Sequence, residues 1–437
     1  MAARWGVTPS TGIAPNRMAL ADPGRRLASW LALLGLVIPA WEAQVSIANA
    51  KFTAGRFLIT ALVVPALVVW ARSGRRLMAA DVATLLMAIW MFVAAAATGG
   101  SLASPAAEAL QFLFAYIVGR ALFSGPASLD AFVRALTALT FFMIVIAIGE
   151  HVIGRWIAHD AAAALFGTTP LTPTFRGNFI RATSTLDHPI LFGVFCALVN
   201  AILLLWAKNA GRRILFSAIC LLGCVLSQSS AALMAYVLGV AAYAYDCLMR
   251  TAPARWTLFW IVLGTVVGLV FLITKHPIGW LISHLTLDPV SGYYRILVWD
   301  AALDRIGSSP LTGYSFKLFN EVILDATVDC VWLVEALHYG LPAIAFLFLA
   351  NIAAVWPGRR RAPGAESDFD RHMNLAFAIV LLLFIFTGIT VHFWNFMWIF
   401  WGMCVGIKAS LRERAIYGGC CDADANGVPD EAFAATG

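Results

Sequence analysis

The sequence predicts an all-α integral membrane protein with about twelve transmembrane helices. Of its 437 residues, 61% are hydrophobic and only 12% are charged, whereas a soluble domain has about 25% charged residues. Apolar runs of about 18 residues or more recur along the whole chain, and each is long enough to cross a bilayer as a helix. Because backbone amides inside a bilayer must bond to one another, we expect helices in all of these runs.

The apolar runs define a membrane domain at residues 29–409. A basic segment at 1–28 precedes it, and a polar tail at 410–437 that we expect to be disordered follows it. Two large polar loops interrupt the domain, at 154–186 and 275–328. The predicted spans are 29–49, 57–71, 80–97, 106–123, 132–153, 187–207, 213–227, 230–249, 256–274, 331–355, 374–390 and 392–408.

The distribution of positive charge predicts the orientation of these spans. Most of the 30 Lys and Arg residues fall in connections on one side, including the three consecutive arginines at 359–361. The positive-inside rule assigns that side to the cytoplasm, so both termini are expected inside and both large loops outside. The first span is too long for a signal peptide and has no cleavage site, so we expect it to be retained.

Glu42 lies inside the first predicted span. A carboxylate in a membrane segment is costly and is a functional candidate by default. The alternative is a hydrogen-bonded glutamate that only packs helices together.

The first outer loop contains arginines that oppose the topology rule. Its TTPLTPTF stretch is too rich in proline to form one helix. Arg176 and Arg181 follow it, and a guanidinium that binds phosphate or carboxylate explains a cation on the outer side. The alternative is an anchor for lipid headgroups. Asp187 is expected to cap the next helix, with Pro189 in the first turn; His188 is then either a site residue or a boundary residue bonded to backbone.

The second outer loop contains two amphipathic stretches and a turn. HPIGWLISHLTLDPV is expected to lie along the membrane surface. RILVWDAALDRI begins with Arg295 and has apolar residues, Trp299 among them, on one helical face and Asp300 and Asp304 on the other. SSPLTGYS is expected to form a turn.

The tenth predicted span begins near Asp329. At 100° per residue, Asp329, Trp332, Glu335 and Tyr339 fall within about 120° of one another on a helix. A stripe of carboxylates and aromatic rings suits a sugar. The alternatives are a first-turn anion at Asp329 and interfacial anchoring by the aromatic residues. Trp394, near the last outer turn, is expected to be such an anchor.

Several function classes lack their sequence signals. The chain has no Walker motif with a lysine, no Gly-x-Gly-x-x-Gly that opens a helix and no Cys-x-x-Cys pair. We therefore predict no metal, no cofactor and no nucleic-acid partner. The chain also lacks a convincing internal repeat, which argues against a transporter.

Three stretches resemble the O-antigen ligase and polysaccharide polymerase superfamily. RATSTLDHPILFG is similar to an arginine-containing segment that ends in a polar-proline helix start. RILVWDAALDRIGSSPLTGYS is similar to an Arg-x-x-x-Trp helix followed by a Pro-Leu-x-Gly turn. VDCVWLVEALHYGLPA is similar to a segment with a polar start, an aromatic residue three positions on and a glycine eleven after the start.

This resemblance implies roles for particular residues. The arginines that handle the lipid pyrophosphate correspond to Arg181 and Arg295. The chain departs from the ligases, because Asp329 and Cys330 stand where His-Asn is usual and Ser230 stands where an arginine is usual. The departure favours a polymerase, with Asp329 as the first candidate for the base. The other catalytic candidates are Glu335 and His188, and the expected substrate-binding residues are Arg176, Asp187, Tyr293, Trp299, Trp332 and Tyr339.

The resemblance also implies a fold and an activity. It implies a GT-C-like glycosyltransferase of a bacterial inner membrane that polymerises undecaprenyl-pyrophosphate-linked glycans at the periplasmic face, inverting and independent of metal. Its partners would be this lipid-linked glycan as donor and acceptor, membrane lipid, a chain-length regulator and export proteins. The alternatives are a ligase that moves the glycan to lipid A core or to a protein, and a polysaccharide transporter or flippase.

Overall fold

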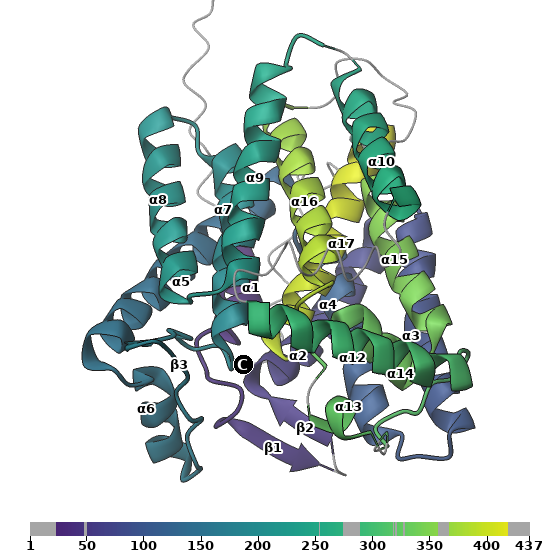
Figure 1. The fold of residues 1–437 in the computed structure, drawn as a ribbon. Helices are drawn as coiled ribbons and strands as arrows, with labels where there is room; N and C mark the ends of the chain where they lie inside the picture. The colour runs from purple at the N-terminus through teal and green to yellow at the C-terminus, as the bar shows by residue number, and fades with distance from the viewer. Residues whose placement is uncertain are drawn as a thin grey trace, which may run out of the picture.

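The computed structural model describes residues 23–417 except 48–49, 253, 274–288, 318, 320, 327 and 357–366. These residues form a mostly helical protein with two short β-hairpins (Figure 1). Six of the helices are long and apolar enough to cross a membrane. The expected helical membrane protein is therefore confirmed, while the number of twelve spans stays a prediction.

The elements follow one another with short connections. The six candidate spans are α2 (Ala54–Arg72), α3 (Ala79–Ala97), α5 (Pro126–Ile153), α7 (Pro189–Trp206), α9 (Ser230–Leu248) and α16 (Asp368–Thr387). The other helices are α1 (Pro23–Leu34), α4 (Ala103–Leu122), α6 (Ile157–Phe166), α8 (Ala210–Leu226), α10 (Arg255–Ile273), α12 (Pro289–Ser308), α13 (Val322–Ala326), α14 (Val331–Tyr339), α15 (Leu341–Val355) and α17 (Phe396–Tyr417). The antiparallel hairpins are β1 (Gln44–Ile47) with β2 (Ala50–Thr53) and β3 (Phe175–Arg176) with β4 (Phe179–Ile180).

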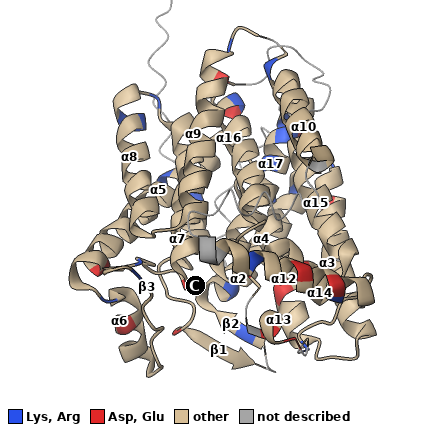
Figure 2. Cartoon of the chain, viewed as in Figure 1, with Lys and Arg blue, Asp and Glu red and all other residues tan. Residues whose placement is uncertain are grey.

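The irregular elements gather at one end of the helices. Figure 1 shows both hairpins, α6 and α13 at this end, with α12 lying across the ends of the upright helices. We call it the hairpin end. Figure 2 shows acidic residues around α12, α13 and α14 there, together with basic residues on the hairpins and at the start of α2. Charged side chains that a bilayer would exclude are thus collected beyond the apolar helices.

The predicted first span at 29–49 is wrong. The helix ends at Leu34, and the chain then turns and enters the β1–β2 hairpin. A side chain at Gly35 would meet the Cα of Gly55 at 2.6 Å, so the chain passes very close to the start of α2 here. Glu42 lies in the turn before β1, is 1% exposed, and accepts a 2.8 Å hydrogen bond on Oε2 from His159 Nδ1. This geometry favours the structural role for Glu42.

The predicted span at 331–355 is two helices. Gly340 separates α14 from α15 with φ +78°, a conformation in which its Cβ would meet Leu311 O at 1.9 Å. The expected turn at 309–315 occupies the break. Its Tyr314 amide donates to Leu337 O (2.7 Å), and Pro310 O accepts from Leu341 N (2.8 Å). The carbonyls that end α14 thus find partners in the turn instead of in a continuing helix.

The two large loops are more ordered than the sequence indicates. The loop at 154–186 contains α6 and the β3–β4 hairpin, while the TTPLTPT residues lie outside any helix, as expected. The expected amphipathic helix at 295–306 is confirmed within α12. The expected surface helix near 278–285 lies outside the described residues. The tail is helical to Tyr417, because Glu413 is held by a 2.6 Å ion pair with the buried Arg120.

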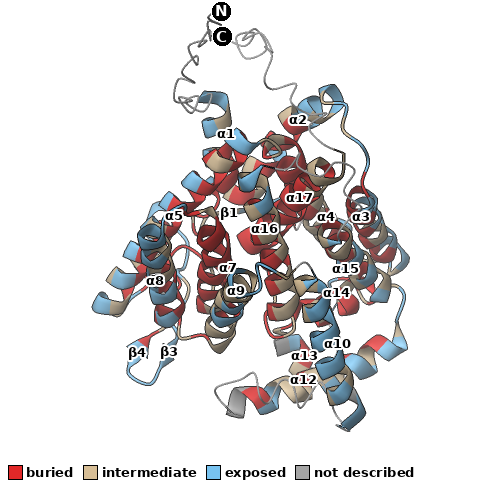
Figure 3. Ribbon diagram, turned by 90° about the horizontal axis from the view of Figure 1, so that it is seen from above, coloured by how far each residue is buried: buried red, intermediate tan, exposed pale blue. Residues whose placement is uncertain are grey.

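The core is built around α7 and α17, whose residues are mostly buried in Figure 3, whereas α10 is largely exposed. Helix α17 packs closely on α4 through glycines. A Cβ at Gly119 would meet Met403 O at 2.3 Å, and a Cβ at Gly406 would meet Tyr116 O at 2.2 Å. Backbone-to-backbone contact of this kind is typical of membrane helices, in which small residues allow close approach.

Replacing Gly406 should therefore disrupt the α4–α17 contact. Gly406→Val forces two backbones apart and should destabilise the protein by about 2 kcal/mol or more, as overpacking does. Gly264→Val makes the same change on α10, where no atom lies within 4 Å of the new Cβ. Thermal unfolding of the purified protein in detergent measures both. Equal melting temperatures for the two variants would contradict this account of the core.

Candidate functional site

Three arginines and one carboxylate from distant parts of the chain meet at the hairpin end. Burial, together with the positive charges of Arg176 and Arg295, lowers the pKa of Arg181 to about 10, and Asp329 acts in the opposite direction. Charges influence a pKa in this way only over short distances. We call Arg176, Arg181, Arg295 and Asp329 the arginine site.

The carbonyl end of α8 holds two of these arginines. Arg181 Nε donates to Ser227 O (3.3 Å), and Arg176 donates to Gln228 O (2.8 Å) through a terminal nitrogen. The carbonyl end of a helix has a negative dipole, which favours cations. Among the described residues, the bond to Ser227 O is the hydrogen bond that the Arg181 side chain donates. A guanidinium has five N–H donors in all. The bond to Ser227 O uses Nε, so the terminal nitrogens of Arg181 take no part in it.

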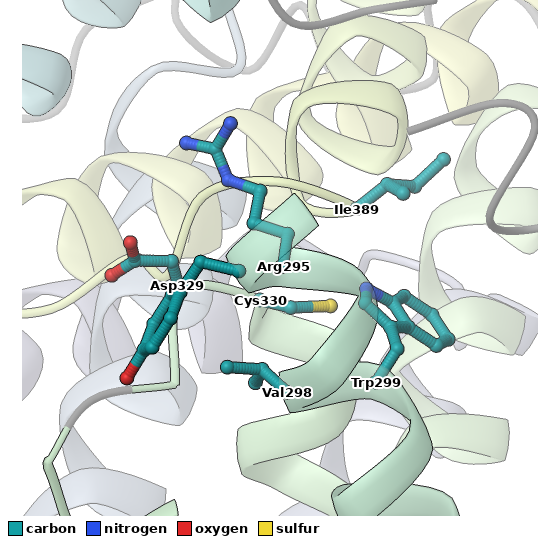
Figure 4. Close-up of a pocket in the computed structure, with 7 residues that line it drawn as sticks. Arg295, Val298, Trp299, Asp329, Cys330 and Ile389 are labelled. Atoms are coloured by element: carbon teal, nitrogen blue, oxygen red, sulfur yellow. The ribbon is translucent and has the colours of Figure 1, made fainter. Parts of the chain in front are cut away.

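Arg295 and Asp329 border one small pocket. Figure 4 shows Arg295, from α12, and Asp329, from the segment before α14, with their charged groups both pointing away from Trp299. The pocket has a volume of about 260 Å³, including the part open to solvent. Its lining residues are Tyr294, Arg295, Val298, Trp299, Asp329, Cys330 and Ile389. Trp299 lines this pocket, and Tyr293, two residues before Arg295, is 65% exposed.

His188, not Asp187, caps α7. His188 Nδ1 accepts a 3.2 Å hydrogen bond from Ile190 N. Burial lowers the pKa of His188 to about 4, with Arg181 acting in the same direction, so the ring is neutral at neutral pH and Nδ1 can accept. Asp187 was predicted to cap the helix, but it accepts instead from Trp41 N (3.0 Å) and Asn395 Nδ2 (2.5 Å). Burial raises the pKa of Asp187, and the Asn395 hydrogen bond opposes that rise.

The residues predicted to form one stripe on the tenth span lie in two separate parts of the structure. Asp329 lies before α14 and so is not on its face, because the helix begins at Val331. Glu335 is 1% exposed, and Tyr339, fully buried, donates a 2.6 Å hydrogen bond to Glu108 Oε2. Trp332 donates from its indole to Ile385 O (3.3 Å). Glu335 and Tyr339 therefore face the interior of the helices, away from the pocket that Asp329 borders.

Segment 388–395, between α16 and α17, contacts both the pocket and the start of α7. It was not predicted from the sequence to be part of a site. Ile389 lines the pocket, and the Trp394 ring lies 6.0 Å from that of His188. Asn395, at φ +50°, bonds to Asp187. Trp394 was expected to be a membrane-belt residue, but it packs on the first residues of α7. Thr390, His392 and Asn395 interrupt the apolar sequence here, which was the available signal.

The side chains of the arginine site can bind an anion and accept a proton. Guanidinium groups bind phosphate oxygens in pairs, and Asp329 supplies a carboxylate beside them. Among the residues that the structure describes, no group of three or more His, Cys, Asp or Glu side chains is arranged to hold a metal ion.

Comparisons with known proteins give no family. No protein-family model matches the chain, and no curated protein matches it either.

The cap at His188 can be tested by its effect on stability. His188→Ala removes the acceptor for Ile190 N and should destabilise the protein by about 1 kcal/mol, as the loss of other helix N-caps does. His188→Asn restores a capping oxygen and should keep most of the stability. The melting temperatures of the two variants in detergent provide the measurement. If the Asn variant is as unstable as the Ala variant, then packing of the imidazole ring, and not the helix cap, accounts for the stability that His188 provides.

Proposed function

We propose that the protein is a membrane glycosyltransferase that polymerises undecaprenyl-pyrophosphate-linked oligosaccharide units at the periplasmic face of a bacterial inner membrane. The observation that supports this most is the gathering of Arg176, Arg181 and Arg295 around Asp329. Three cations held together at the end of apolar helices suit a lipid diphosphate, whose headgroup is anionic and whose tail is hydrocarbon. The resemblance of three sequence stretches to the polymerase and ligase superfamily points to the same substrate.

The proposed reaction is one displacement. An acceptor hydroxyl on one lipid-linked unit attacks the anomeric carbon of the donor glycan. The bond between that carbon and the phosphate oxygen breaks, and its electron pair leaves with the undecaprenyl pyrophosphate. Arg181 and Arg295 stabilise the growing negative charge on the leaving group, and Asp329 takes the proton of the acceptor hydroxyl.

The charge distribution along the helices fits this orientation. The ends of the helices opposite the hairpin end carry many arginines, which the positive-inside rule assigns to the cytoplasm. Those on described residues include Arg72, Arg75, Arg76, Arg212, Arg213, Arg250, Arg255, Arg371, Arg412 and Arg414. The hairpin end would then be periplasmic, where lipid-linked repeat units are polymerised in this superfamily.

A polysaccharide transporter or flippase is the second candidate. Transporters bind substrate where membrane helices are discontinuous and polar groups face the interior. The break at Gly340 and the buried Glu335 beside it are features of that kind. Purified protein in liposomes separates the two functions. A polymerase lengthens lipid-linked chains on one side of the membrane, a ligase would move a chain to a new acceptor, and a flippase changes only the leaflet of the substrate.

Removal of either central arginine should abolish polymer formation. In Arg181→Ala and Arg295→Ala strains we expect single repeat units without polymer, while the protein still accumulates in the membrane. Arg134→Ala is the control, because Arg134 is exposed and its contacts, with Asp130 (2.7 Å) and the Trp206 ring (5.7 Å), do not include the arginine site. Gel profiles of the glycans, with immunoblots of the protein, measure both. Full polymer yield from both site variants would rule out the proposed mechanism.

The proposed base can be tested separately. Asp329→Asn keeps the shape of the side chain but removes its ability to accept a proton, so it should slow polymerisation by about a hundredfold or more. Asp304→Asn is the matched control on the exposed face of α12. Initial rates with lipid-linked units in detergent give the comparison. A near-normal rate for the Asp329 variant would assign the base to another group.

A further inference from the structure

The segment 181–188 determines where Arg181 and His188 lie, because it carries both. Its middle residues, Thr183, Ser184 and Thr185, are at most 3% exposed although all three are polar. Polar residues this deeply buried need hydrogen-bond partners. The segment has no regular secondary structure; the Thr183 hydroxyl donates to Leu186 O within it, and the other partners come from other elements.

Glu150, near the end of α5, supplies the central partner. It is fully buried, and its Oε2 accepts hydrogen bonds from the amides of Thr183 (3.0 Å) and Ser184 (2.9 Å). Ser184 has φ +56°, a left-handed conformation that is unfavourable for any residue except glycine. A single carboxylate oxygen therefore holds two consecutive amides at the one strained position of the segment.

The remaining contacts hold the two ends of the segment and the side chains of its turn, where Ser184 Oγ donates to Met143 O (2.8 Å) and Thr185 Oγ1 donates to Leu36 O. Ala182 N donates to Leu226 O (3.0 Å), and the Trp156 indole donates to Arg181 O (2.9 Å). At the other end, His159 Nε2 lies 3.0 Å from Leu186 O, and its Nδ1 bonds to Glu42. Between these ends, the Thr183 and Ser184 amides depend on Glu150.

We propose that Glu150 is a positioning residue for the arginine site, one that fixes the turn at 183–184 and thereby sets where the Arg181 guanidinium meets a diphosphate. That this ligand is a diphosphate rests on the proposed function. Without the carboxylate, two buried amides lose their acceptor, and the strained conformation of Ser184 is held only through its side-chain hydrogen bond to Met143 O. Arg181, two residues before the turn, is then no longer held in one position. The site must be ordered when the diphosphate binds, so the affinity for the diphosphate falls.

The first measurement is the affinity of the purified protein in detergent for inorganic pyrophosphate. Glu150→Ala should weaken binding by about tenfold or more, because misplaced groups lose most of the benefit of preorganisation. Glu150→Gln keeps a carbonyl oxygen for both amides and should bind within about threefold of the unchanged protein. The control is Asp130→Ala, which removes a carboxylate from the other end of the same helix. Equal affinity for the Ala and Gln variants, at equal melting temperatures, would overturn the proposal.

The second measurement does not depend on the ligand. Hydrogen exchange of the Thr183 and Ser184 amides should become faster in Glu150→Ala and stay slow in Glu150→Gln and Asp130→Ala. If the unchanged protein binds no pyrophosphate, the anion site of the proposed function fails, and the exchange rates alone decide the role of Glu150. Slow exchange at both amides in Glu150→Ala would show that other contacts hold the turn and would refute the positioning role.

Discussion

Repulsion between like charges is the constraint on which the hairpin end depends. Arg176, Arg181 and Arg295 are close enough to lower the pKa of Arg181, so bringing them together costs free energy. The carbonyls of Ser227 and Gln228 and the carboxylate of Asp329 offset part of that cost. An anion that enters such a site relieves part of that repulsion.

The irregular parts of the chain are what bring the charges together. The turn at 309–315 occupies the break after α14, so this short helix ends beside α12 instead of continuing across the core. Segment 388–395 connects the pocket to the start of α7. Each of these segments is held by backbone hydrogen bonds to neighbouring elements, which gives a loop the rigidity that a binding site requires.

The interior carries its own polar groups, and two clusters of them are bonded internally. At the end opposite the hairpins, Arg120 pairs with Asp81 (3.0 Å) and Glu413 (2.6 Å) and ties three helices together. Nearer the hairpin end, Arg56 donates to Gln111 (2.6 Å), which donates to Asn395 O (2.7 Å). Buried charges satisfied in this way specify one arrangement of helices. In the arginine site, by contrast, the charges of Arg176 and Arg295 oppose that of Arg181.

By itself, the sequence determined the helical membrane class, the position of the two polar loops and the amphipathic helix over 295–306, which lies within α12. Apolar run length and helical periodicity are local properties, so they can be recognised without the fold. Only the tertiary structure decided that Glu42 and Glu335 are buried, that His188 caps α7 in place of Asp187, and that α14 ends at Gly340. Those outcomes depend on partners such as His159, which bonds to Glu42, and the turn at 309–315, which lie far away in the chain and meet these residues only after packing.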